Sequence, residues 1–86
     1  MITDKELEEI EARVNSAQPG PWKAIIEGRD QESGSSFILT GGDGDNRGED
    51  IYLDGATDDD YDFIANARQD IPRLLQEFRE LKKKII

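Results

Sequence analysis

The chain contains no cysteine and no histidine. Without cysteine it has no disulfide bond, no thiolate metal ligand and no thiol nucleophile. Without histidine it lacks the side chain that most often serves as a general base or a metal ligand near neutral pH. The remaining carboxylates, lysines, tyrosines and hydroxyls form no recognisable catalytic pattern. We therefore expect a protein that is not an enzyme and that uses no metal and no cofactor.

Long apolar runs are also missing. No segment approaches the roughly 20 apolar residues of a membrane-spanning helix. The N-terminus lacks the charged and then apolar pattern of a secretion signal. These absences predict a soluble protein of the cytoplasm with no membrane partner. A length of 86 residues predicts a single domain, spanning 1–86, with a modest core.

Positive charge is scarce relative to negative charge. The sequence holds 11 Lys and Arg against 20 Asp and Glu, which gives a net charge of −9. Most of this excess lies in residues 41–62, which contain nine carboxylates and one arginine. Such a field disfavours binding to nucleic acid and favours a basic protein, a cation or simple solvation. We expect no nucleic-acid partner.

The N-terminal segment has the start signals of a helix. Thr3 and Glu6 have the spacing of a capping box, in which each side chain binds the other's backbone N–H. Leu7, Ile10 and Val14 then form one apolar stripe. The prolines of NSAQPGP cannot continue a helix. The pattern predicts a helix at about 3–17.

A second, longer helix is predicted to follow Thr57, a good N-cap before three aspartates that suit the first helical turn. Apolar residues then recur at alternating steps of three and four, as in a coiled-coil seam. The seam consists of Ile64, Ala67, Ile71, Leu74, Phe78, Leu81 and Ile85. Pro72 predicts a kink or a break near Asp70–Ile71. We expect a homodimer through this C-terminal helix, in which the distal half of the seam, Leu74 to Ile85, pairs with a second copy; the alternative is that the seam packs entirely within one chain.

Three short segments between the helices are rich in β-branched and aromatic residues, at 22–28, 36–40 and 50–54. Their short connections favour antiparallel pairing, because parallel strands need long crossovers. The predicted fold class is therefore α+β, with an N-terminal helix, a three-stranded antiparallel meander and a long kinked C-terminal helix.

The segment GGDGDNRGED (41–50) separates the second and third predicted strands. Its aspartates match part of the spacing of an EF-hand calcium loop, but Arg47 occupies a position that needs an oxygen ligand. We expect a flexible hairpin loop, since glycine, asparagine and aspartate all favour turns. The alternative is a weak calcium site at Asp43, Asp45 and Glu49.

Two separated segments, SAQPGPW (16–22) and YDFIANARQDIPRLLQEFREL (61–81), together resemble the Ead-like accessory proteins of bacteriophages and prophages. The resemblance covers about a third of the chain and leaves out its middle. Asp62 stands where the family usually has alanine, and Arg68 stands where asparagine is commoner. The matching residues are Pro19, Gly20, Pro21 and Trp22 in the turn and Phe63, Ile64, Ala65, Ala67, Leu74, Leu75, Glu77 and Leu81 in the helix.

The resemblance implies a small, non-essential phage protein in the bacterial cytoplasm, without established enzymatic activity. Small phage accessory proteins often act on host machinery or host defences by binding. The residues themselves allow two kinds of binding site, which use different parts of the chain.

The first candidate is a pocket for a nucleotide-like molecule on the long helix or at a dimer interface. Trp22 is either a core anchor or a stacking wall for a planar ligand. Lys23 and Arg68 would supply positive charge, and Tyr61 and Asn66 would supply hydrogen bonds. Such a protein would counteract host defence by sequestering the ligand.

The second candidate is an acidic surface that docks residues 43–62 on a basic host protein. Carboxylates at a rigid helix start can imitate the spaced phosphates of DNA. The residues concerned are Asp50, Asp54, Asp58, Asp59, Asp60 and Asp62.

Overall fold

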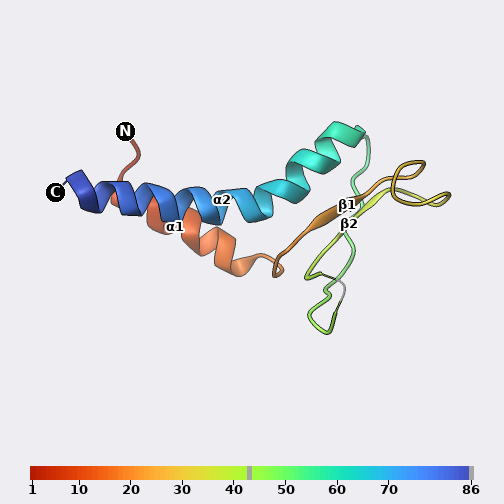
Figure 1. The fold of residues 1–86 in the computed structure, drawn as a ribbon, viewed down its shortest axis with the longest axis horizontal. Helices are drawn as coiled ribbons and strands as arrows, with labels where there is room; N and C mark the ends of the chain where they lie inside the picture. The colour runs from red at the N-terminus through yellow and green to blue at the C-terminus, as the bar shows by residue number, and fades with distance from the viewer. Residues whose placement is uncertain (43, 86) are drawn as a thin grey trace.

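The computed structural model describes residues 1–42 and 44–85. Its elements are helix α1 (Asp4–Ser16), strand β1 (Lys23–Ile25), strand β2 (Phe37–Leu39) and helix α2 (Asp58–Ile85). Helix α1 lies along the C-terminal part of α2, and the sheet lies beside its N-terminal part (Figure 1). The molecule is elongated as a result, with extents of 53 × 28 × 19 Å.

Helix α1 begins where the sequence predicts. The Thr3 hydroxyl accepts a hydrogen bond from Glu6 N at 3.1 Å, and Glu6 Oε1 accepts one from Thr3 N at 2.9 Å. This capping box satisfies two backbone N–H groups that the helix leaves unpaired. Leu7 is buried, and ion pairs from Arg79 to Glu11 (2.6 Å) and from Lys82 to Asp4 join α1 to α2.

Helix α2 has a capping box of its own. The Thr57 hydroxyl accepts from Asp60 N at 3.1 Å, and Asp60 Oδ2 accepts from Thr57 N at 3.0 Å, which confirms the predicted cap. Pro72 does not break the helix, which runs unbroken from Asp58 to Ile85. Figure 1 shows α2 bending between its first turns and the remainder, as expected where a proline crowds the carbonyl of Arg68. Among the described residues, no helix is both long and apolar enough to cross a membrane.

The predicted three-stranded meander is wrong. Strands β1 and β2 form a two-stranded antiparallel sheet, with Ala24 opposite Ile38. The third predicted strand, 50–54, contributes one isolated bridge, in which Ile51 and Ile38 exchange backbone hydrogen bonds of 2.8 and 2.9 Å. The α+β class is still compatible with this arrangement.

Side chains from elsewhere in the chain end the pairing on both sides of Ile51. Glu49 N donates to Gln18 Oε1 at 2.8 Å, and Glu49 O accepts from the Thr40 hydroxyl at 2.9 Å. Leu53 N donates to the Tyr61 hydroxyl at 3.1 Å, and that hydroxyl donates to Leu53 O at 3.0 Å. The backbone groups that a third strand needs for its ladder are therefore already occupied.

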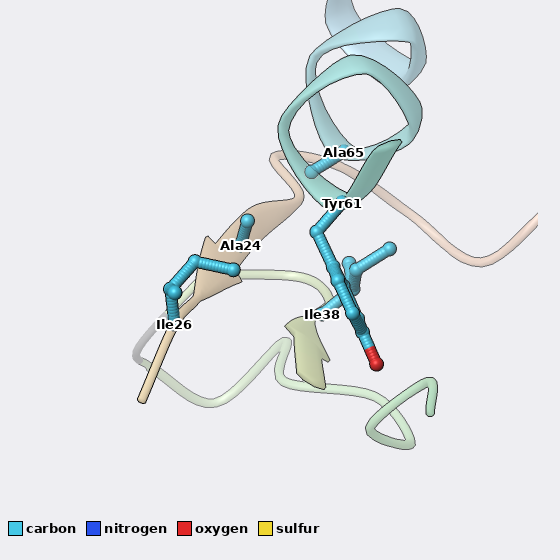
Figure 2. Close-up of a cluster of buried hydrophobic side chains, with 5 residues drawn as sticks. All are labelled: Ala24, Ile26, Ile38, Tyr61 and Ala65. Atoms are coloured by element: carbon cyan, nitrogen blue, oxygen red, sulfur yellow. The ribbon is translucent and has the colours of Figure 1, made fainter. Parts of the chain in front are cut away.

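The hydrophobic core lies between the sheet and the first turns of α2 (Figure 2). Ala24 and Ala65 are small, which lets the helix approach the sheet closely. The buried cluster consists of Ala24, Ile26, Ile38, Tyr61 and Ala65. This contact fixes the start of α2 and, through it, the position of Trp22 beside the helix.

The seam of α2 is mostly uncovered within one chain. The buried residues of the helix are Tyr61, Ala65 and Leu75, which lie beside the seam rather than on it. The exposed fractions of Leu74 and Leu81 are 66% and 57%. Helix α1 and the sheet therefore pack against a neighbouring face of α2.

Candidate functional site

A groove opens between the end of α1, the PGPW turn and the middle of α2, with a volume of about 230 Å³. We call it the Trp22 groove. Its lining combines apolar side chains with two arginines. It is formed by Arg13 and Val14 from α1, Ala17 at the C-cap of α1, Trp22 from the turn, and Ile64, Ala67, Arg68 and Ile71 from α2.

The side chain of Gln69 holds Trp22 against α2. Gln69 Oε1 accepts from Trp22 N at 2.7 Å, and Gln69 Nε2 donates to Trp22 O at 3.1 Å. The indole Nε1 donates to the carbonyls of Gln18 and Pro19, at 3.2 Å each. Because the ring N–H is used within the chain, a ligand in the groove would meet the indole through its apolar surface.

Arg68 is oriented by the same turn. Its Nε donates to the Gln18 carbonyl at 2.9 Å, which fixes the plane of the guanidinium. Within residues 1–42 and 44–85, no carboxylate forms an ion pair with Arg68 or Arg13. A planar guanidinium suits two-point binding of phosphate or carboxylate.

Three of the residues predicted for this site lie elsewhere. Tyr61 is buried in the core, where its hydroxyl binds the backbone of Leu53. Asn66 is exposed and donates to Asp62 O, one turn earlier on α2, at 2.7 Å. Lys23 is exposed on β1, opposite Leu39. The structure thus brings together Trp22 and Arg68, but not Lys23, Tyr61 or Asn66.

Sequence reasoning missed Arg13, Gln18 and Gln69. Arg13 directly precedes Val14 of the apolar stripe, and this position at the edge of the stripe was a usable signal. Gln18 joins the turn to the 40–49 segment, through Thr40 at 3.2 Å and Glu49 N at 2.8 Å. Nothing in the spacing of either glutamine indicates these contacts.

A wider groove, of about 450 Å³, runs along the outer contact of α1 and α2. The arginine and the lysine that line it already have partners, because Arg79 pairs with Glu11 at 2.6 Å and Lys83 with Glu80 at 3.7 Å. An anion would have to displace these carboxylates. The Trp22 groove is the better candidate for an anionic ligand.

Half of the predicted acidic surface already has partners within the chain. Arg29 binds Asp62 with both terminal nitrogens, at 2.8 and 3.0 Å, and Arg47 binds Asp50 at 2.7 Å. The hydrogen bond from the Arg29 guanidinium lowers the pKa of Asp62, and its carboxylate partners raise the pKa of Arg29. Asp60 caps α2.

The remaining predicted carboxylates, Asp54, Asp58 and Asp59, are exposed near the start of α2. The calcium alternative depends on Asp43, which lies outside the described residues. In the part of the chain that the structure describes, no three carboxylates are placed to hold a metal ion together.

The chain matches no family model, no curated protein and no solved structure in the comparisons made. The resemblance to Ead-like accessory proteins therefore stays a prediction from the two motifs.

Proposed function

We propose that this protein is a non-enzymatic phage accessory protein that sequesters a small nucleotide-like molecule in the Trp22 groove. By binding this molecule in the bacterial cytoplasm it would counteract a host defence that depends on it. The proposal depends on one observation: Trp22, Arg13 and Arg68 line the same, largely apolar groove.

The lining of the groove supports a ligand with a planar ring and an anionic group. The indole of Trp22 and the side chains of Ile64 and Ile71 offer apolar surface for a ring. Arg13 and Arg68 would bind phosphate oxygens, and Arg68 is already oriented by Gln18. This combination of stacking and paired cations is typical of nucleotide recognition.

The groove is better suited to holding a ligand than to converting it chemically. The lining residues include no carboxylate, no hydroxyl and no lysine among those described. A guanidinium stays protonated near neutral pH and cannot act as a general base. A ligand bound there would be held without a group positioned to transfer its protons.

Calorimetric titration with nucleoside phosphates and cyclic dinucleotides, with inorganic phosphate for comparison, would test this function. Arg13→Ala should weaken binding roughly tenfold or more, because a hydrogen bond to a charged group is worth about 1.5–3 kcal/mol. Arg68→Ala should have a similar effect. Arg73→Ala is the matched control, because Arg73 is an exposed arginine on α2 outside the groove. If no compound binds, or if all three variants bind equally, the proposal is wrong.

The acidic surface is a second candidate, supported by the exposed Asp54, Asp58 and Asp59. It would dock on a basic host protein. Partner binding should then weaken as salt rises, and Asp58→Asn with Asp59→Asn should weaken it further. These two changes leave the Asp60 cap and the Arg29–Asp62 pair in place. Binding that is insensitive to salt would exclude this function.

A further inference from the structure

The seam of α2 is an apolar surface that residues 1–42 and 44–85 leave partly exposed. Its seven positions extend over three heptads, from Ile64 to Ile85, on a helix of 28 residues that is about 42 Å long. Leu74, Leu81 and Ile85 are exposed along it, and Phe63 is exposed beside it. A continuous apolar surface of this kind marks a protein interface.

The charges at the two ends of α2 have opposite signs. Asp58, Asp59 and Asp60 fill the first turn, and Lys82, Lys83 and Lys84 fill the last. A parallel pair of α2 helices would place like charges together at both ends. An antiparallel pair would place the lysines of each helix beside the aspartates of the other, and would oppose the helix dipoles favourably.

We infer that a second copy of this chain covers the seam, with the two α2 helices antiparallel. The order of seam side chains supports one register. With Ile71 of one copy beside Leu74 of the other, the large Phe78 meets the small Ala67, and Leu81 meets Ile64. This register places the largest seam side chain against the smallest, and almost the whole length of both helices overlaps. The acidic and basic ends then lie about one turn apart.

The same arrangement would complete the Trp22 groove. Ile64, Ala67 and Ile71 belong to both the seam and the groove lining. The groove of about 230 Å³ is below the roughly 300–1,000 Å³ of typical ligand sites. In this register, Leu74, Phe78 and Leu81 of the second copy would extend its wall and exclude water. This last step rests on the proposed function, whereas the dimer itself does not.

The oligomeric state of the full chain, without ligand, tests the dimer. Light scattering after size exclusion should give twice the chain mass of 9.7 kDa. Leu74→Glu and Leu81→Glu should each weaken the dimer roughly 100-fold or more, because each buries an unpaired charge. Gln76→Glu, also exposed on α2 but off the seam, is the control. Circular dichroism identifies any variant that fails to fold, and the other seam variant then gives the answer.

Cysteine crosslinking tests the orientation, because the native chain has no cysteine of its own. Leu81→Cys alone and Ile64→Cys alone should not form disulfide dimers in an antiparallel pair. An equal mixture of the two variants should crosslink one to the other. In a parallel pair each variant would form disulfide dimers with itself. The mixture would then give no disulfide between the Leu81→Cys variant and the Ile64→Cys variant.

Charge exchange gives a second measure of orientation. Lys83→Glu with Lys84→Glu should weaken an antiparallel dimer roughly tenfold, and adding Asp58→Lys with Asp59→Lys should restore it. Neither Lys83 nor Lys84 pairs with α1 among the ion pairs of the described residues. A monomeric wild type, self-crosslinking of Leu81→Cys, or no restoration by the exchange would each overturn the inference.

If the dimer forms and no ligand binds, the proposed function is wrong and the proposed interface is supported. If a ligand binds to a monomeric protein, the proposed function is supported and the proposed interface is wrong. The two proposals are therefore tested separately.

Discussion

The side-chain amide of Gln69 binds both backbone polar groups of Trp22, with bonds of 2.7 Å to the nitrogen and 3.1 Å to the oxygen. The two residues are 47 positions apart in sequence. This contact attaches the PGPW turn to α2 and places the indole on the wall of the groove.

Gln69→Leu should lower the free energy of unfolding by about 1–3 kcal/mol. The change keeps the size of the side chain but leaves a partly buried N–H and carbonyl of Trp22 without a partner. Urea unfolding followed by the fluorescence of the single tryptophan measures the loss. Gln76→Leu, at an exposed position of the same helix, should change little; an equal loss in both variants would contradict this role.

Tyr61→Phe should destabilise the fold by about 1–3 kcal/mol, because Leu53 N would lose its hydrogen-bond acceptor. The ring would still fill its place in the core. Tyr52→Phe is the matched control, since the exposed fraction of Tyr52 is 62%. Thermal unfolding of both variants makes the comparison. If both melt at the wild-type temperature, the Tyr61 hydroxyl does not stabilise the end of the 50–54 segment.

Gly41→Ala should be more damaging than Gly55→Ala. Both glycines have positive φ, +74° and +75°, where an L-residue costs about 1–2 kcal/mol. A Cβ on Gly41 would also lie 1.9 Å from the carbonyl oxygen of Asn46, whereas a Cβ on Gly55 would meet nothing within 4 Å. The difference between the free energies of unfolding of the Gly41→Ala and Gly55→Ala variants measures the cost of the clash with Asn46. Equal losses would mean that the 41–46 turn can move to admit the methyl group.

The pKa of Asp62 should lie below that of an ordinary aspartate, because Arg29 hydrogen-bonds its ionised form. A carboxyl whose pKa is lower in the folded state stabilises the fold above its unfolded pKa. That contribution is lost as the pH falls through the folded value. Arg29→Met should raise the pKa of Asp62 toward that of an ordinary aspartate, as measured by carbon NMR of the carboxyl group.

Arg47→Met is the control for this titration, because Arg47 pairs with Asp50 instead. It should leave the titration of Asp62 unchanged. A pKa of Asp62 that does not respond to Arg29→Met would mean that the ion pair does not persist in solution.

The helices could be predicted because their signals are local. Thr3 and Glu6 form the predicted capping box, and Thr57 caps α2 as predicted; the bond from Thr57 N to Asp60 Oδ2 adds a second capping box that was not predicted. The absence of the third strand could not be predicted, because Gln18 and Tyr61 bind the backbone groups of the 50–54 region from other parts of the chain. Side-chain competition of this kind leaves no periodic pattern in the sequence.

The candidate site was predicted only in part, for a related reason. Trp22 and Arg68 were identified by residue type, and the fold brings them together. Tyr61 is predicted to supply a hydrogen bond to the ligand, yet the fold uses its ring in the core and its hydroxyl on the backbone. Spacing on one helix does not reveal which face the sheet will cover.

Native mass spectrometry of the full-length protein with added nucleotides tests the central claim most directly. Wild type should retain a nucleotide-like ligand, while Arg68→Ala and Arg13→Ala should lose it and Arg73→Ala should keep it. Absence of any adduct on the wild type, or equal adducts on all four proteins, would contradict binding in the Trp22 groove.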